Sequence, residues 1–247
     1  MVKYRIRFCK TGRAKYVSHL DLLKVFTRCA RRTGLDLEYS QGFNPHAEMV
    51  FSAPLPLGMT SEAEYVDIDL TGERDTEELL EVLIKSLPSG IVPVKIRKLE
   101  PGEGSVMKPV RYAAYRISVS CPEGEVREIF LDAVGRCLES GEAVMTAKKS
   151  KSGVKVVDIR PMILSFGSDP AVCEGGQLSF GAVLACGNEV NLRPEVAFRG
   201  IFDKISGVDI SKSADEQDES VPGPFSGFEF VSAHKLVFLD SEKNELW

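Results

Sequence analysis

The sequence lacks the patterns that identify several large classes of protein. No apolar run approaches the roughly 18–20 residues that a membrane-spanning helix needs. The first residues alternate polar and apolar side chains, so they lack the continuous apolar stretch of a secretory signal. There is no P-loop, no glycine-rich dinucleotide motif, no H-E-x-x-H zinc motif and no nucleophile elbow. We therefore expect a cytoplasmic protein without a membrane partner, and no motif names a reaction for it.

The cysteines give no sign of a metal site. None of them forms a C-x-x-C pair or a clustered metal-binding spacing. In a reducing compartment such cysteines are expected to be buried or inert, and we expect no iron–sulfur cluster or other cofactor. They are Cys9, Cys29, Cys121, Cys137, Cys173 and Cys186.

What the sequence does have is a strong polarity of charge. The chain of 247 residues is 43% hydrophobic, which suits one large domain or two small ones. Its net charge of −5 hides a division: residues 1–48 contain ten Lys or Arg and four Asp or Glu, whereas residues 62–81 contain nine acids and one Arg. Such asymmetry can mark a nucleic-acid-binding face on an acidic protein.

Hydrophobic periodicity predicts an α+β fold of two ferredoxin-like (β-α-β-β-α-β) units in tandem, the second divergent. Residues 1–100 are expected to form the first domain, 101–110 a linker and 111–247 the second domain. An acidic segment at about 205–226, poor in apolar residues, is expected to be mobile. The expected strands lie at 4–8, 35–39, 49–51, 66–70, 91–99, 111–120, 154–159, 178–185 and 234–239. Four helices are expected. Two of them span residues 77–86 and 125–139, and the other two begin at Ser18 and at Pro194.

The helix that begins at Ser18 carries the strongest candidate surface. Ser18 suits its N-cap, with Asp21 in its first turn, and Gly34 suits its end. Its apolar stripe, expected to face the core, is Leu20, Leu23, Phe26 and Ala30. Its basic residues and those just before it, expected to form one surface for phosphates, are Lys10, Arg13, Lys15, Lys24, Arg28, Arg31 and Arg32. The alternatives are a solvated helix face or docking against the acidic residues 62–81.

Two histidines and one loop add candidate chemistry. His19 and His46 could act as acid and base in metal-independent RNA cleavage, although His19 could equally be a packed or capping residue. In the loop at 40–46, Phe43 could stack on a base while Gln41 and Asn44 read its edge. The alternative is a tight loop whose Phe43 fills the core, and the sequence alone does not decide between them.

Two further charged groups have different expected roles. The basic residues of the first strand, Lys3, Arg5 and Arg7, are expected to be neutralised by Asp67 and Asp69 across the sheet. Because that face displays charge in place of aromatic rings, RRM-style RNA recognition is not expected. A basic hairpin tip is a second candidate contact for RNA. Its residues are Lys148, Lys149 and Lys151.

Several short segments together resemble one bacterial family. They are residues 4–8, 18–21, 39–45 and 61–65, and more loosely 157–161 and 192–195. The family they resemble is the radical-SAM-linked domain of unknown function, which occurs alone or fused behind a cobalamin-binding radical SAM enzyme. The resemblance implies association with a radical SAM system. The chain itself lacks the C-x-x-x-C-x-x-C triad that holds the cluster in such enzymes.

The leading hypothesis is therefore a non-catalytic RNA-binding module that works with a radical SAM modification enzyme. Two alternatives remain open at this point. One is a metal-independent endoribonuclease that uses His19 and His46. The other is a protein-interaction domain that docks on a radical SAM partner. The sequence does not indicate an oligomeric state.

Overall fold

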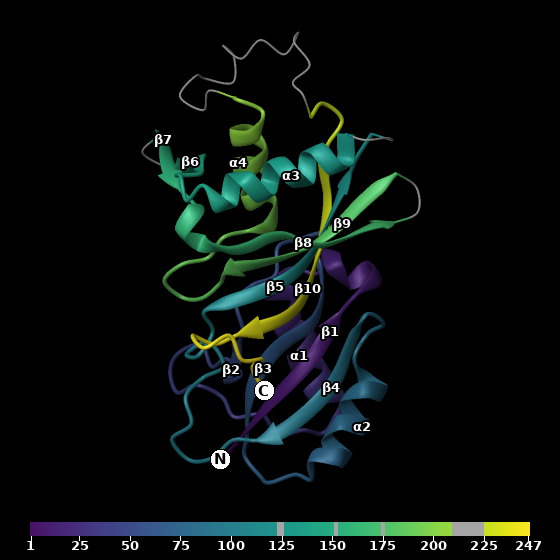
Figure 1. Cartoon of the computed structure of the whole chain (residues 1–247). Coiled ribbons are helices and arrows are strands. Elements are labelled where there is room, and N and C mark those ends of the chain that lie inside the picture. The colour runs from purple at the N-terminus through teal and green to yellow at the C-terminus, as the bar shows by residue number, and fades with distance from the viewer. Residues whose placement is uncertain (123–125, 151–152, 174–175, 209–224) are drawn as a thin grey trace. The chain divides into compact units, whose positions relative to one another are not determined.

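The protein has a mixed α+β architecture of two compact units (Figure 1). The computed structural model describes residues 1–122, 126–150, 153–173, 176–208 and 225–247. Unit 1 comprises Met1–Arg111 and His234–Trp247, and unit 2 comprises Tyr112–Ala233. The sequence prediction gave residues 234–247 to the second domain, whereas the structure groups them with the first. In the described part of the chain, no helix is both long enough and apolar enough to cross a membrane.

Unit 1 contains an antiparallel sheet with the strand order β4-β1-β3-β2 and two α-helices. Its elements are β1 (Val2–Lys10), the 3-10 helix η1 (Gly12–Tyr16), α1 (His19–Thr33), β2 (Met49–Phe51), β3 (Thr60–Leu70), α2 (Thr76–Ser86) and β4 (Ile91–Lys98). The strand expected at 35–39 is absent from these described elements. That segment forms only isolated bridges, in which Leu37 pairs with Leu70 and Tyr39 with Ala47.

The core of unit 1 lies between the sheet and the two helices. Phe26 of α1 packs against Phe8 of β1 and Phe51 of β2, with ring centroids 5.2 Å and 5.6 Å apart. On α1 the buried residues include Leu22, whereas Leu20 is 70% exposed. The expectation that Leu20 faces the core is therefore wrong, because the buried stripe of α1 passes through Leu22 and Phe26.

The opposite face of β1 holds paired charges, as expected for two of its three basic residues. Arg5 donates to both carboxylate oxygens of Asp67, at 2.7 Å and 2.9 Å, and both residues are buried. Lys3 lies 3.3 Å from Asp69. The partner of Arg7 is Glu245, at 2.7 Å, so the expected neutralisation by Asp67 and Asp69 is wrong for Arg7 alone.

The final strand explains why the C-terminus belongs to unit 1. In β10 (Glu229–Leu239), His234 and Lys235 run parallel to Thr60 and Ser61 of β3. His234 has a structural environment, as expected: its Nδ1 lies 2.7 Å from Thr60 Oγ1 and its Nε2 lies 3.1 Å from Glu62. Beyond the strand, the Tyr65 hydroxyl donates to the carbonyl of Leu246.

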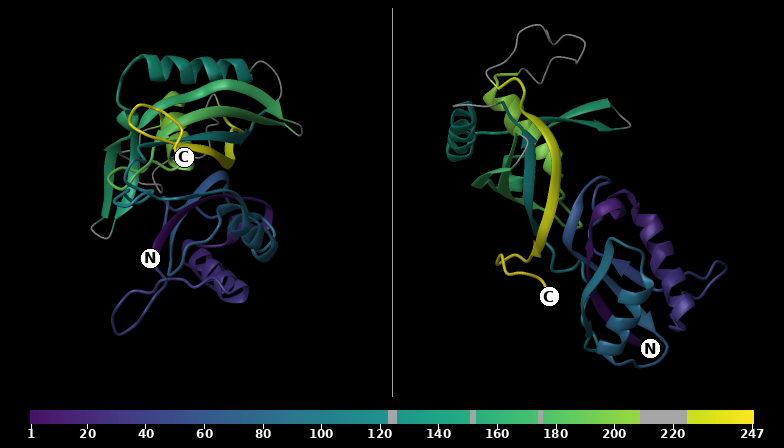
Figure 2. Two further views of the ribbon diagram at one scale, coloured as in Figure 1. Left: turned by 90° about the horizontal axis from the view of Figure 1, so that it is seen from below. Right: turned by 90° about the vertical axis from the view of Figure 1, so that its right-hand side faces the viewer.

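In unit 2, β5 lies between β9 and β10, and β8 follows β9 (Figures 1 and 2). Its elements are β5 (Tyr112–Ser120), α3 (Val126–Glu139), β6 (Met145–Ser150), β7 (Gly153–Asp158), the 3-10 helix η2 (Arg160–Met162), β8 (Ile163–Cys173), β9 (Gln177–Ala185) and α4 (Pro194–Ile205). Strands β6 and β7 pair with each other in a separate hairpin. The sequence prediction missed β6 and β8.

An aromatic cluster lies at the C-terminal end of the segment that was expected to be mobile. Phe130 of α3 stacks on Phe228 with ring centroids 4.3 Å apart, and its ring meets that of Phe225 at 5.5 Å. Phe225, near the end of that segment, is buried. Most of that segment, residues 209–224, lies outside the described residues.

Candidate functional site

The start of α1 is built as its sequence predicts. The Ser18 side chain accepts the backbone N–H of Asp21 at 3.2 Å, and its hydroxyl donates to the Asp21 carboxylate at 2.7 Å. These hydrogen bonds and the neighbouring ammonium of Lys24, at 3.1 Å, hold the pKa of the Asp21 carboxyl below its usual value. The helix ends at Gly34, whose φ of 66° is in the left-handed region.

Most of the predicted basic surface is accessible to a ligand. Arg13, Lys24, Arg28, Arg31 and Arg32 are exposed. Within the part of the chain that the structure describes, Arg28 and Arg31 form no ion pair. Arg32 is partly engaged, because its guanidinium donates to the carbonyl of Ser86 at 2.8 Å. These residues, together with the half-buried Lys15, form what we call the basic face.

Lys10 does not belong to the basic face, and its predicted place at the surface is wrong. It is the last residue of β1 and is only 1% exposed. Its ammonium donates to the carbonyl of Val17 at 2.7 Å. Burial lowers the pKa of Lys10, while the charge of Glu64 raises it and that of Lys235 lowers it. A phosphate at the surface therefore cannot reach this ammonium.

Residues 40–46 form a loop that is closed by an isolated β-bridge between the residues on either side of it. Tyr39 pairs with Ala47, and the backbone N–H of Ser40 donates to the carbonyl of His46 at 2.9 Å. The Ser40 hydroxyl oxygen also accepts the backbone N–H of His46 at 3.1 Å and lies 2.8 Å from its Nδ1. Gly42 at the tip has a φ of 146°, which side chains disfavour. In Figure 2 the loop projects from the body of unit 1.

The tip of the 40–46 loop presents an aromatic ring to solvent. Phe43 has a relative exposure of 104%, and Gln41 and Asn44 beside it are exposed as well. The alternative in which Phe43 fills the core is therefore wrong. A solvated phenyl ring offers a flat apolar face that a ligand can cover.

The two candidate histidines have different surroundings. His19 is the first residue of α1, and its ring lies edge-on to Phe51 with centroids 5.4 Å apart. His46 is engaged with Ser40. Both are exposed. No group of three or more His, Cys, Asp or Glu that could hold a metal occurs among the described residues. A catalytic role for these histidines stays a prediction.

The cysteines are located as expected where the structure describes them. Cys29, Cys121, Cys137 and Cys186 are buried, and Cys9 is half-buried. Burial raises the pKa of the Cys29 and Cys137 thiols, which makes them poor nucleophiles at neutral pH. The side chain of Cys173 lies outside the described residues.

The basic hairpin is described only in part. Strands β6 and β7 pair with Ser150 opposite Gly153, which agrees with a hairpin tip at this position. For Lys148 and Lys149 the structure describes the backbone alone, and Lys151 lies outside the described residues. Their predicted contact with RNA stays a prediction.

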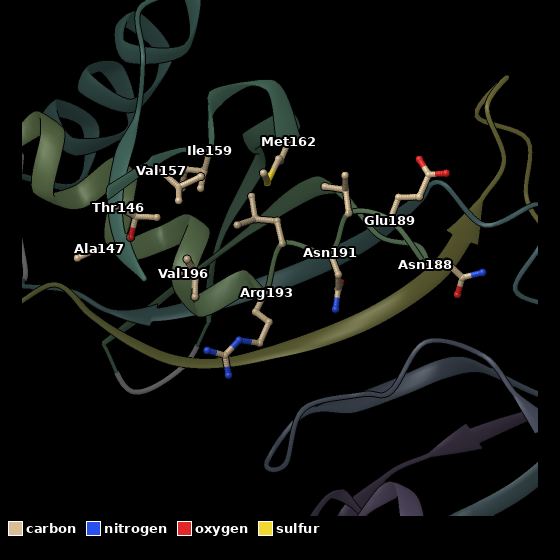
Figure 3. A pocket seen from close by; sticks show the side chains of 12 residues that line it. Thr146, Ala147, Val157, Ile159, Met162, Asn188, Glu189, Asn191, Arg193 and Val196 are labelled. Carbon is tan, nitrogen blue, oxygen red and sulfur yellow. The ribbon is translucent and has the colours of Figure 1, made fainter. Parts of the chain in front are cut away.

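Unit 2 contains a cavity of about 840 Å³ that the sequence prediction did not include (Figure 3). Its walls come from β6, β7, η2, the loop after β9 and the start of α4. They are Thr146, Ala147, Val157, Ile159, Met162, Asn188, Glu189, Val190, Asn191, Leu192, Arg193 and Val196. Two segments could have indicated this cavity in the sequence, because both contribute to its walls. They are residues 157–161 and 192–195, which resemble the same bacterial family.

The 157–161 segment owes its shape to two polar residues. The Asp158 carboxylate accepts the backbone N–H groups of Val144 and Arg160, each at 2.9 Å. The Arg160 guanidinium donates to the carbonyls of Ile163 and Leu138, at 2.9 Å and 2.8 Å. These contacts tie β7 to the end of α3 and hold the wall of the cavity in place.

Fold and site together define an α+β protein with a basic helix, an aromatic-tipped loop and a separate cavity. Residues 3–194 match the model of a family described as "Uncharacterized protein conserved in bacteria" (DUF2344). The chain belongs to this family.

Other comparisons are distant. No curated protein matches the chain. Among solved structures, a chain of the "Crystal Structure of a Cbf5-Nop10-Gar1 Complex" is similar with 7% identity and a TM-score of 0.43. The likeness covers 95% of this chain and 48% of that chain, so this protein spans about half of its length. No argument about function rests on a likeness this weak.

Proposed function

We propose that this protein is a non-catalytic RNA-binding module that works with a radical SAM enzyme. The observation that carries the proposal is the fully exposed ring of Phe43 at the tip of a closed loop, between Gln41 and Asn44. Every base has a flat face that can stack on such a ring, and amide side chains can pair with base edges. The hydrogen bonds between Ser40 and His46 restrain the backbone of the loop that carries the ring, which lowers the ordering cost of binding.

The basic face supplies the phosphate contacts in this proposal. Arg28 and Arg31 are exposed, and like charges at this spacing on a helix repel each other without an anionic ligand. Neutralising phosphates releases counterions, which makes binding dependent on salt. The proposed phosphate ligands are Arg13, Lys15, Lys24, Arg28, Arg31 and Arg32, with Lys148, Lys149 and Lys151 of the hairpin.

Filter binding of cellular RNA to the full chain, over a series of salt concentrations, tests the proposal. Replacing Phe43→Ala removes one stack, worth roughly 1–3 kcal/mol, and so should weaken binding by about tenfold or more. Ile129→Ala, which removes another exposed apolar side chain, is the matched control and should leave binding unchanged. RNA binding that is absent, or that does not respond to salt, would overturn the proposal.

The phosphate contacts have their own variants. Arg28→Ala should weaken binding to all RNAs alike and lower the salt slope by about one. Lys85→Ala on α2 is the matched control, because Lys85 is an exposed helix cation paired with Glu81 at 3.0 Å. Equal effects of the two substitutions would mean that the basic face is not the RNA site.

A second candidate function, docking on the radical SAM partner, is favoured by three exposed apolar residues. Tyr16, Leu20 and Leu57 are 66%, 70% and 63% exposed. The backbone N–H of Gly58 donates to the carbonyl of Lys15, which brings Leu57 close to Tyr16. Exposed apolar groups of this kind are typical of protein interfaces. Co-purification with a co-expressed radical SAM protein, lost in Leu20→Glu and retained in Ile129→Glu, would support docking at these residues.

We also infer that both units are ferredoxin-like. In unit 1 the element order is β1-α1-β2-β3-α2-β4 and the sheet order is β4-β1-β3-β2. In unit 2, with the β6–β7 hairpin set aside, the element order is β5-α3-β8-β9-α4-β10 and the sheet order is β10-β5-β9-β8. Both orders of elements are β-α-β-β-α-β, and the two sheet orders correspond strand by strand.

A further inference from the structure

We infer that the cavity of unit 2 is a nucleotide-binding site, which takes a nucleoside monophosphate either free or as part of an RNA strand. The inference concerns different residues from the 40–46 loop and the basic face, so it does not depend on them. Its basis is the set of chemical groups around the cavity: an apolar wall, a hydroxyl, two amides and a guanidinium at the start of a helix.

The apolar wall suits the faces of a base. Val157, Ile159 and Met162 lie along one side of the cavity in Figure 3, and Leu192 and Val196 complete the apolar lining. Ile159 and Leu192 are each only 3% exposed, so the chain around them holds their positions. Apolar side chains as well as aromatic ones hold bases that have left a stack.

The wall is also held from behind by α4. A Cβ atom on Gly200 would lie 2.7 Å from Cδ1 of Ile159 and 3.4 Å from Cγ1 of Val144. The helix therefore packs directly onto the residue that forms the wall, and a Cβ atom at Gly200 would require the Ile159 side chain to shift. A cavity with a wall fixed in this way is formed before its ligand arrives, as binding sites for small molecules usually are.

A largely buried threonine in the lining has a hydroxyl that makes no hydrogen bond to the described chain. Thr146 is 7% exposed and lines the cavity. Its side chain forms no hydrogen bond within the part of the chain that the structure describes. Its oxygen is not among the fully buried atoms that lack a partner, so it opens to the cavity, where a water or a ligand can bond to it. A base edge or a ribose hydroxyl can donate to it or accept from it.

The opposite side of the cavity offers polar groups of the kinds that nucleotides use. Asn188 and Asn191 each carry a donor and an acceptor, which can pair with the mixed donor and acceptor edge of a base. Glu189 can accept from ribose hydroxyls or an exocyclic amine. An aliphatic acid could occupy the apolar wall but would leave these amides without ligand partners.

The guanidinium of Arg193 provides the anion contact. Its side chain is 57% exposed and lies 3.1 Å from Glu195. Arg193 is the N-cap residue of α4, and its contact with Glu195 uses only part of its five donors. The start of α4 adds the positive end of the helix dipole, which favours a phosphate at the same place. The cavity volume of about 840 Å³ is ample for one nucleotide and its phosphate.

Isothermal titration calorimetry on the full chain tests the site with AMP, CMP, GMP and UMP, their nucleosides, inorganic phosphate and single-stranded hexanucleotides. At least one monophosphate should bind with one site per chain, and more tightly than its nucleoside or phosphate alone. If hexanucleotides bind and monophosphates do not, the ligand is a nucleotide within RNA. Binding of neither class would overturn the inference, and so would phosphate binding as tight as that of the nucleotides.

Variants assign the binding to the cavity. Thr146→Val keeps the shape of the side chain and removes its hydroxyl, and Arg193→Gln removes the charge. Each should weaken nucleotide binding by about tenfold, since a charged or buried hydrogen bond is lost. Arg199→Gln, on the same helix but outside the cavity, is the matched control and should change binding less than twofold. Equal binding by Thr146→Val and the parent would overturn the inference. Hexanucleotide binding that survives Phe43→Ala but not Thr146→Val separates this site from the 40–46 loop.

Discussion

The Ser40 hydroxyl oxygen lies 2.8 Å from Nδ1 of His46 and also accepts the backbone N–H of that residue. The two residues close the loop that presents Phe43. The Ser40 hydroxyl donates to the ring nitrogen or accepts from it, according to the tautomer of His46. This pair is therefore the element that fixes the geometry of the proposed base-stacking loop.

Replacing Ser40→Ala should loosen the loop without unfolding the protein. We expect RNA affinity to fall about fivefold, which corresponds to roughly 1 kcal/mol of lost preorganisation. The free energy of unfolding should change by less than about 0.5 kcal/mol, because the loop is exposed. Filter binding and urea unfolding measure the two quantities. A large loss of stability with unchanged RNA affinity would show that the Ser40–His46 contact serves the fold and not the ligand.

The endoribonuclease alternative predicts that His19 and His46 cleave RNA, whereas the RNA-binding proposal predicts that bound RNA stays intact. An acid–base pair must reach the proton it moves from about 2.6–3.2 Å or through one water. His19 contacts Phe51 and His46 contacts Ser40, so each ring has a neighbour that accounts for its position. We expect RNA incubated with the protein and EDTA to remain intact on a denaturing gel. Cleavage that survives EDTA and is lost in His19→Ala would establish the enzyme instead.

Arg5 and Asp67 form a buried pair whose loss should be costly. Asp67 also accepts the backbone N–H of Val106 at 2.9 Å, and Arg5 also donates to the carbonyl of Gly104 at 3.0 Å. Asp67→Ala leaves the Arg5 charge buried without its partner, which should lower the free energy of unfolding by about 3–5 kcal/mol. Urea unfolding measures it. The exposed pair of Lys85 and Glu81 is the control: Glu81→Ala should cost less than about 1 kcal/mol. Similar losses in both variants would contradict the prediction.

The features that could be predicted from the sequence are those that depend on short-range patterns, such as helix caps and the alternation of residues along a strand. Ser18 caps the N-terminus of α1, and Gly34 ends the helix in a left-handed conformation. Each signal acts on the residues next to it, so both ends of α1 can be predicted from the local sequence. The pairing of Arg5 with Asp67 follows from strand alternation and charge. By contrast, Arg7 pairs with Glu245, which lies 238 residues further along the chain, and no local pattern indicates such a partner.

Other errors have equally specific causes. Leu20 and Leu22 both fit an apolar helical stripe, and only the packing of Phe26 against β1 and β2 decides between them. Whether Phe43 is buried or exposed depends on how the loop leaves the sheet, which composition does not specify. The cavity of unit 2 draws its walls from segments around 146, 159 and 191, so it exists only after the chain has folded.

Lys10 was expected at the surface but is buried, and the charges of Glu64 and Lys235 act on its ammonium. This burial leads to a further prediction. Lys235 lies 2.5 Å from Glu64, and all three residues are buried. Glu64→Gln removes the negative charge that offsets two buried ammonium groups. We expect it to lower the free energy of unfolding by about 3–5 kcal/mol at pH 7. Thermal or urea unfolding measures the loss, and a variant as stable as the parent would contradict it.

Lys10→Met should have the opposite effect, since it removes one ammonium and leaves the pair of Lys235 and Glu64 intact. At pH 7 the variant should be at least as stable as the parent. The pKa of Lys10 is lowered in the folded protein, so the unfolded chain binds more protons just below its ordinary pKa of about 10.5. The parent therefore gains stability as pH rises towards that value, and its difference from Lys10→Met should shrink. Urea unfolding at pH 7, 8 and 9, with the exposed Lys85→Met as control, measures the trend. A difference that stays constant or widens with pH would show that the buried Lys10 is fully protonated throughout.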